Sequence, residues 1–176
     1  LLPLVDASTK LLSVRYSILQ LLWVRFFFPF WFIMVITVWR HGTKCFVIGR
    51  PVPLLVRGVL WLGSNICFAT AIKFIPLAEG MALLFFSSVI LIVLSWLVLS
   101  EPIQLDRWVA SGLGLVAVLM IIRPGFSDFN SSGLLALGAA GLFALYLLST
   151  RLLSRSEPPL VLMSYQLAGA LLLLTP

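Results

Sequence analysis

Ionisable side chains inside the apolar segments of this chain are the first candidates for chemistry. Asp6 lies four residues before Lys10, close to the start of the sequence. A carboxylate at membrane depth is costly and by default marks a pathway or coupling site, so Asp6 could carry a coupling proton or orient a solute. Alternatively, Asp6 pairs with Lys10 on one helix face, with the lysine amine reaching toward the membrane surface. Asp6 and Lys10 are thus candidates for coupling or gating.

A second set of candidates combines aromatic rings with small polar groups in the middle of apolar segments. Trp61 and Asn65 share a helix face, where a ring could stack on a planar metabolite and an amide could bond to it. Asn65 could equally tie two helices together. Ser87, Ser88 and Tyr146 are weaker candidates of the same kind, because hydroxyls and tyrosine rings also serve ordinary packing. These residues are the predicted lining of a substrate cavity.

Glu79 is the remaining carboxylate of interest, and it follows Pro76 at the predicted start of a helix. A carboxylate there is stabilised by the helix dipole, which explains its position fully. The alternative is a vestibule carboxylate that attracts cationic solutes, so Glu79 joins the coupling or gating candidates. The lone His41 and the lack of any Cys/His cluster predict no catalytic residue, no metal site and no cofactor.

The composition is that of a membrane protein. Of the 176 residues, 61% are hydrophobic and only 10% are charged, against roughly 25% charged residues in a soluble domain. The net charge of +6 comes from basic residues that stand singly between apolar runs. A nucleic-acid partner is therefore not expected, and the lipid bilayer is.

Apolar runs of about 20 residues, separated by charges, Gly and Pro, predict membrane-spanning helices. A first run ends near Leu12, others cover 20–39, 54–72, 77–99, 108–122 and 133–150, and another begins at 160. Gly138 and Gly141 would allow close helix contacts. The runs are too uniformly apolar for a membrane barrel. We predict an all-α polytopic membrane protein with about seven spans present, as a piece of a longer chain.

Loop charges predict the orientation, because Lys and Arg accumulate on the cytoplasmic side. One side collects Arg40, Lys44, Arg50, Arg57, Arg107, Arg151 and Arg155. The other side holds Lys10, Arg15, Lys73 and Arg123. We therefore expect a cytoplasmic N-terminus and an external link at 73–76.

A short stretch occurs twice, each time at the end of an apolar segment. Residues 8–13 read STKLLS and residues 149–154 read STRLLS. The interval between them holds an odd number of predicted spans, which would turn the second copy upside down. Inverted repeats of this kind are typical of secondary transporters.

From residue 57 to residue 125 the pattern resembles the EamA domain of the drug/metabolite transporter superfamily. The residues that carry the resemblance are 71–79 (AIKFIPLAE), 82–84 (ALL), 94–97 (LSWL), Glu101, Trp108, Gly112 and 121–125 (IIRPG), together with Asp6, Ala7, Lys10 and Arg25 in the opening helices. Ser88 stands where many members have Pro, and Ser100 replaces a common Gly before Glu101.

The resemblance implies a ten-helix protein of two inverted five-helix repeats, with 1–124 as the first repeat and 125–176 as the start of the second. It further implies a secondary transporter that moves a small organic metabolite or drug-like solute by alternating access through a central cavity. The expected location is the bacterial inner membrane, with protons as a candidate coupling ion and a homodimer as a candidate assembly.

Two other classes of membrane protein are alternatives to a transporter. A polytopic membrane enzyme would need a His, Asp and Glu cluster or a nucleophile motif, which the sequence lacks. A retinal-type receptor would need a lysine in its seventh helix, and 160–176 has none.

Overall fold

The computed structural model describes residues 2–41, 51–99, 105–122, 131–154 and 158–175. The helices are α1 (Leu2–Leu12), α2 (Ile18–His41), α3 (Pro51–Phe74), α4 (Leu77–Leu99), α5 (Leu105–Ile122), α6 (Ser131–Leu153) and α7 (Pro159–Leu174). The basic loops used to predict the orientation, at 42–50 and 155–157, lie outside the described residues.

Every apolar run of the sequence is a helix, and the described residues contain no strand. The all-α prediction is confirmed. In the part of the chain that the structure describes, four helices are long and apolar enough to cross a membrane, namely α2, α3, α4 and α6, and α7 is a shorter apolar helix. Pro51 and Pro159 begin α3 and α7, because a proline is tolerated in the first turn of a helix, where its missing N–H has no helical partner.

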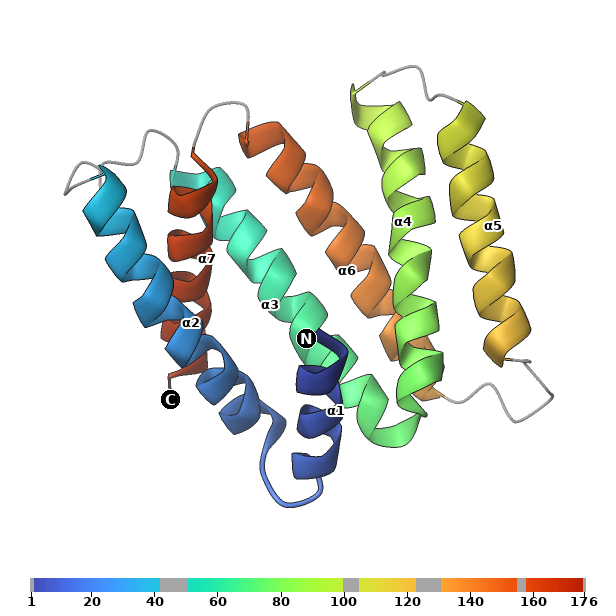
Figure 1. Ribbon diagram of the computed structural model, residues 1–176, viewed down its shortest axis with the longest axis horizontal. Coiled ribbons are helices and arrows are strands. Elements are labelled where there is room, and N and C mark those ends of the chain that lie inside the picture. The colour runs from blue at the N-terminus through green and yellow to red at the C-terminus, as the bar shows by residue number, and fades with distance from the viewer. Residues whose placement is uncertain (1, 42–50, 100–104, 123–130, 155–157, 176) are drawn as a thin grey trace.

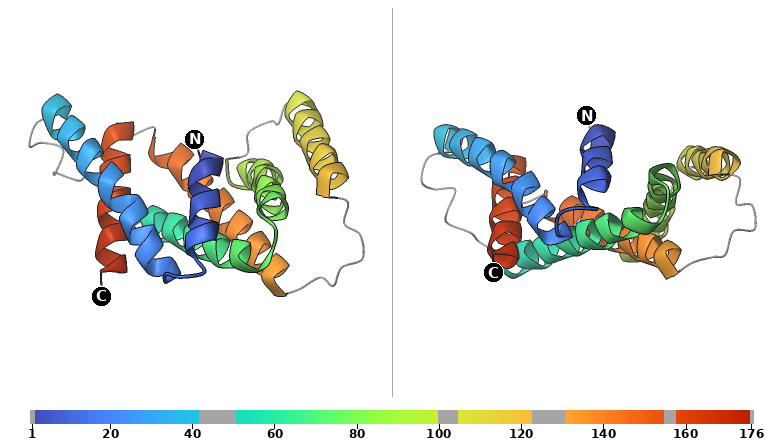
Figure 2. Two further views of the ribbon diagram at one scale, coloured as in Figure 1. Left: turned by 60° about the horizontal axis from the view of Figure 1, so that its bottom comes forward. Right: turned by 90° about the horizontal axis from the view of Figure 1, so that it is seen from below.

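The helices α3 and α6 lie side by side in the middle of the molecule (Figure 1). On one side α2 packs against α7, and on the other α4 packs against α6 and α5 against α4. Figure 2 shows α1 standing on the face of α3, between α2 and α4. The first half of α1 is therefore next to the helices that form the candidate site.

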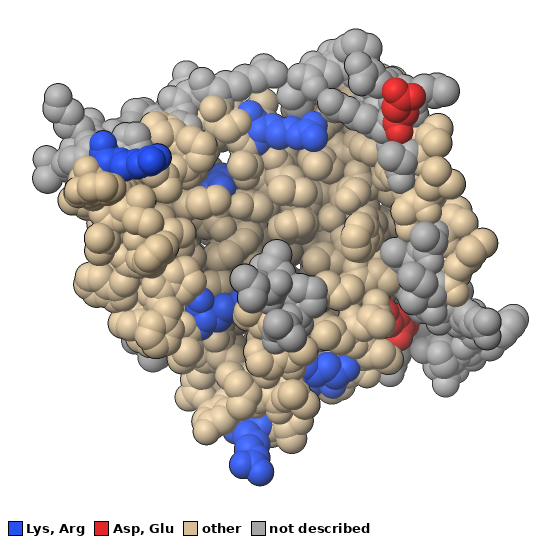
Figure 3. Space-filling model, viewed as in Figure 1, with Lys and Arg blue, Asp and Glu red and all other residues tan. Residues whose placement is uncertain are grey.

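The distribution of polar and apolar side chains is the reverse of that in a soluble protein. Large apolar residues face outward, with Phe28 at 71% and Trp39 at 84% exposure, whereas Arg57 is only 2% exposed. On the face drawn in Figure 3, Lys and Arg are spread singly over a mostly uncharged surface. Such an exterior is stable only when lipid covers it.

Alanines of α6 take part in its close contact with α3. Ala136 packs with Ala71 and Ile75, Ala139 packs with Phe68 and Ile72, and the Ser64 hydroxyl of α3 donates to the carbonyl of Ala139 at 2.9 Å. The prediction that Gly138 and Gly141 serve this purpose was wrong, because a Cβ at either position would meet nothing within 4 Å.

At the short link between α3 and α4, Gly80 allows the two helices to approach closely. A Cβ at this position would lie 2.9 Å from Cγ2 of Ile72 and 3.5 Å from Cε2 of Phe68. Only glycine lets the first turn of α4 approach the last turns of α3 so closely.

Candidate functional site

A cavity of about 360 Å³ lies between α2, α3, α6 and α7, beside the start of α1. Its hydrogen-bonding side chains are Arg25, Trp61, Tyr146 and Gln166, and the remaining lining is mainly apolar. An apolar cavity of this size with a few convergent polar groups is the usual form of a small-molecule site.

The two aromatic candidates from the sequence meet in this cavity. Trp61 comes from α3 and Tyr146 from α6. The Trp61 ring packs on Phe26 of α2, with ring centroids 4.6 Å apart and planes inclined by 41°. This contact belongs to a core shared by α2, α3 and α7, so Trp61 packs against that core while lining the cavity.

Pro29 of α2 also lines the cavity. Inside a helix, proline removes the N–H that would bond to the carbonyl four residues earlier, which is that of Arg25. The carbonyl oxygen of Arg25 therefore lacks its usual helical donor, and this acceptor lies next to the Arg25 side chain.

Arg57 of α3 bonds to Tyr146 of the cavity lining and donates three hydrogen bonds in all among the described residues. Its Nε donates to Thr150 Oγ1 at 2.9 Å, its Nη1 to the carbonyl oxygen of Leu162 at 2.9 Å, and its Nη2 to the Tyr146 hydroxyl at 3.2 Å. These partners belong to α6 and α7. One buried guanidinium therefore ties three helices together.

Tyr146 extends this network to the cavity wall. Its ring lies under the Arg57 guanidinium, with the central carbon 5.0 Å from the ring centroid, which is within the range of a cation–π interaction. Its hydroxyl donates to Gln166 Oε1 at 3.2 Å. Arg57, Tyr146 and Gln166 thus form a chain that ends at a residue of the cavity lining.

The coupling candidate Asp6 pairs across helices, in a way that the sequence did not predict. Asp6 Oδ1 accepts from Arg25 Nη1 at 2.7 Å, and their side chains are 10% and 22% exposed. The alternative that Asp6 pairs with Lys10 was wrong. Arg25 is a better partner because its planar guanidinium matches a carboxylate, and because α1 and α2 face one another here.

Lys10 has a different function in the structure. Its Nζ donates to the backbone carbonyl of Ile75 at 2.6 Å, just after the end of α3. The last carbonyls of a helix lack partners and carry partial negative charge. The Lys10 ammonium therefore caps α3.

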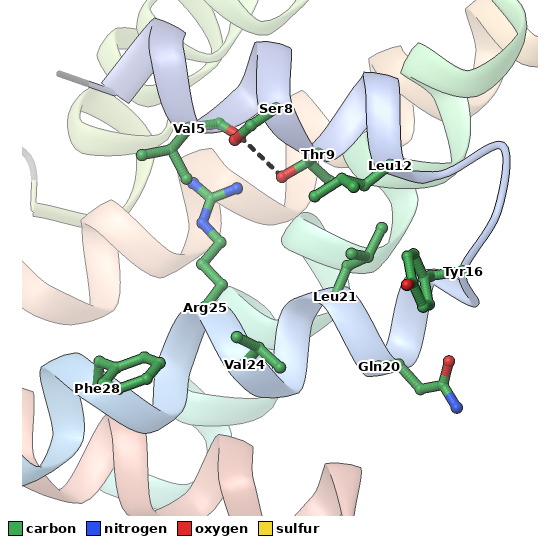
Figure 4. Close-up of a pocket in the computed structure, with 10 residues that line it drawn as sticks. All are labelled: Val5, Ser8, Thr9, Leu12, Tyr16, Gln20, Leu21, Val24, Arg25 and Phe28. Carbon is green, nitrogen blue, oxygen red and sulfur yellow. Dashed lines mark hydrogen bonds between the residues drawn. The ribbon is translucent and has the colours of Figure 1, made fainter.

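A second cavity, of about 430 Å³, lies between α1 and α2 (Figure 4). Figure 4 shows the Arg25 side chain extending from α2 toward Val5 of α1. Both residues also line the first cavity. Arg25, fixed by Asp6, therefore stands at the boundary between the two spaces.

The remaining sequence candidates do not line the first cavity. Asn65 uses its amide to donate to the Trp61 carbonyl at 2.8 Å within α3. In α4, Ser87 is buried at 4% exposure, whereas Ser88 is exposed. Glu79 is half-buried in the first turn of α4, as the helix-dipole explanation requires.

Sequence reasoning missed Gln166 and the bonding of Arg57. Gln166 is only 7% exposed in α7, and its position in an otherwise apolar run was an available signal. Arg57 was counted as a basic residue near a helix end. Within the described residues, no group of three or more His, Cys, Asp or Glu could hold a metal ion.

The sequence profile of the EamA-like transporter family matches residues 5–123. Among curated proteins, the riboflavin transporter of Vibrio cholerae is 36% identical over 102 residues, covering 58% of this chain and 33% of that protein. The S-adenosylmethionine uptake transporter of Rickettsia felis is 25% identical over 140 residues, covering 80% of this chain and 47% of that protein.

The corresponding transporter of Rickettsia prowazekii is 24% identical, with the same coverage. The chain thus spans between 33% and 47% of the length of these relatives. No solved structure gives a significant match.

Proposed function

Because the chain belongs to the EamA-like transporter family and is a multi-pass membrane protein, we propose that it moves a small organic metabolite across a membrane. The observation that carries the proposal is the cavity between α2, α3, α6 and α7. It lies among α2, α3 and α6, which are long and apolar enough to cross a membrane, and the shorter apolar helix α7. It places two aromatic side chains beside Arg25 and Gln166.

The solute class follows from the cavity chemistry. Trp61 and Tyr146 offer ring surface, which favours planar solutes. The names of the relatives point the same way, because riboflavin and S-adenosylmethionine both contain a fused nitrogen heterocycle. A planar heteroaromatic metabolite is therefore the proposed substrate, bound between α3 and α6.

Alternating access between two inverted repeats is the proposed mechanism, with 1–124 as one repeat and 125–176 as the start of the next. The repeated motif closes α1 and α6, and these helices run in opposite directions in Figure 1. Thr9 and Thr150 each donate to the carbonyl of the residue four positions earlier at 2.8 Å. Ser13 and Ser154 likewise each donate to the carbonyl three positions earlier. The opposite directions of α1 and α6 support an inverted repeat.

The ion pair between Asp6 and Arg25 is the proposed gate and coupling element. A proton on Asp6 would remove the charge that holds Arg25, and Arg25 borders both cavities. Proton binding would then be linked to the passage between them. Lys10 of α1, whose amine bonds to the carbonyl of Ile75, and Glu79, at the start of α4, are further candidates for gating.

The proposed location is a bacterial inner membrane, with the N-terminus in the cytoplasm and a homodimer as a candidate assembly. The direct test of function is counterflow exchange in proteoliposomes, with radiolabelled riboflavin, S-adenosylmethionine and an amino acid as the panel. Saturable exchange of a heteroaromatic solute, absent from protein-free liposomes, is the expected result. No exchange of any solute would contradict the proposal.

A further inference from the structure

Of the four hydrogen-bonding side chains of the cavity, Arg25 and Trp61 can only donate hydrogen bonds. Arg25 has only donors, and its Nη1 is engaged by Asp6. Trp61 has a single ring N–H and no acceptor. The chemistry of the whole site therefore depends on how the other two polar groups, Tyr146 and Gln166, are oriented.

Arg57 determines the orientation of Tyr146. A guanidinium cannot accept a hydrogen bond, so the Tyr146 oxygen is the acceptor in its 3.2 Å contact with Arg57 Nη2. The hydroxyl proton is then free for the second contact, with Gln166 Oε1 at 3.2 Å. Both bonds are satisfied only with this direction of donation.

Tyr146 in turn determines the orientation of Gln166. An amide oxygen and nitrogen are distinguished by the network around them, and here the oxygen is the atom that accepts from Tyr146. The amide nitrogen makes no hydrogen bond within the described residues. Gln166 lines the cavity, so its amide nitrogen is available to donate a hydrogen bond to a solute.

We propose that Gln166 is a specificity-determining residue, which donates from Nε2 to an acceptor atom such as a ring carbonyl on a planar solute. Arg57 and Tyr146 are the positioning residues that keep the amide in this orientation. The cavity then presents donors from Arg25, Trp61 and Gln166, so solutes with carbonyl acceptors are favoured. This inference rests on the proposed function of the cavity.

The selectivity can be measured with two flat tricyclic probes of similar ring area. Lumiflavin carries ring carbonyls, whereas phenazine, which is also neutral, has ring nitrogens but no carbonyl. Binding is followed by equilibrium dialysis with the protein in nanodiscs, corrected for empty nanodiscs. The wild-type protein is expected to bind lumiflavin about tenfold more tightly than phenazine, since a buried donor left unpaired is costly.

Two variants test the assigned residues. Gln166→Met keeps the side-chain length but removes the donor, and should weaken lumiflavin binding about tenfold while phenazine binding stays the same. Tyr146→Phe keeps the ring but releases Gln166 Oε1, and should weaken lumiflavin binding alone by about threefold or more. Ser164→Ala is the matched control, because among the described residues the hydroxyl of this buried α7 serine bonds only to the carbonyl of Val161.

The outcomes separate the inference from the proposed function. Equal weakening of both probes in Gln166→Met, or no change in either, would overturn the specificity role. A wild-type protein that binds both probes equally, or neither while exchanging other solutes, would overturn it and leave the transporter proposal intact. A protein that neither binds nor exchanges any solute would overturn both.

Discussion

The guanidinium of Arg57 lies 5.0 Å from the centre of the Tyr146 ring and donates to its hydroxyl at 3.2 Å. This contact joins α3 to α6, and the further bond to the carbonyl of Leu162 adds α7. Three of the four helices around the candidate cavity, α3, α6 and α7, are therefore tied together by one buried side chain. Within the described residues this side chain has no carboxylate partner.

Arg57→Met should destabilise the protein, because it removes the three hydrogen bonds that hold α6 and α7. The expected loss is about 1–3 kcal/mol, visible as a lower melting temperature in detergent. Arg151→Met is the control, since exposed Arg151 donates to Ser95 at 3.2 Å. Equal losses of stability in the two variants would contradict the conclusion that Arg57 holds α3, α6 and α7 together.

Gly80→Ala should also destabilise the protein, since its Cβ would lie 2.9 Å from Cγ2 of Ile72. The overpacking is expected to cost about 1–3 kcal/mol, measured by the same melting curves. Gly138→Ala is the matched control, because a Cβ there meets no atom within 4 Å. A stable Gly80→Ala variant would show that α3 and α4 can separate at no cost.

The fold was predictable to a large extent because lipid imposes a simple rule on the sequence. Segments long enough to cross a bilayer must be helical and apolar, so runs such as 77–99 marked α4 exactly at its observed ends. How helices associate was not predictable in the same way. Nearly every residue of a span is apolar, and the alanines of α6 look no different in sequence from those that face lipid.

The site was predictable only in its aromatic part. Trp61 and Tyr146 stood out by their size and type, and both line the cavity. The partner of Asp6 was not predictable, because the choice between Lys10 within its own helix and Arg25 on the next depends on how α1 and α2 pack. Gln166 gains its significance from Tyr146, a residue on another helix.

Asp6→Asn tests the coupling role, because it preserves the shape of the side chain but removes its charge and its titratable proton. We expect solute accumulation driven by a pH gradient to be lost while counterflow exchange is retained. Glu79→Gln, at the start of α4, should keep the pH dependence. If Asp6→Asn also kept the pH dependence of solute accumulation, the ion pair with Arg25 would be purely structural.

The predicted orientation can be checked with a thiol reagent that does not cross membranes. Cys45 lies in the loop at 42–50, outside the described residues, and is expected on the cytoplasmic side. In intact cells of a Cys67→Ser background, a maleimide should leave Cys45 unmodified and should label a Phe74→Cys, Cys45→Ser variant. The reverse labelling pattern would place the N-terminus outside.

The central claim is that solute binds in the cavity lined by Trp61. It is tested most directly by counterflow exchange in proteoliposomes, comparing Trp61→Ala with Asn65→Ala for the solute that the wild-type protein exchanges. Asn65 is one turn away but bonds to the Trp61 carbonyl and does not line the cavity. We predict that Trp61→Ala lowers the initial exchange rate about tenfold at normal abundance, since loss of a stacking ring costs about 1–3 kcal/mol, whereas Asn65→Ala stays near the wild-type rate. Full exchange by Trp61→Ala would contradict the account and place the solute elsewhere.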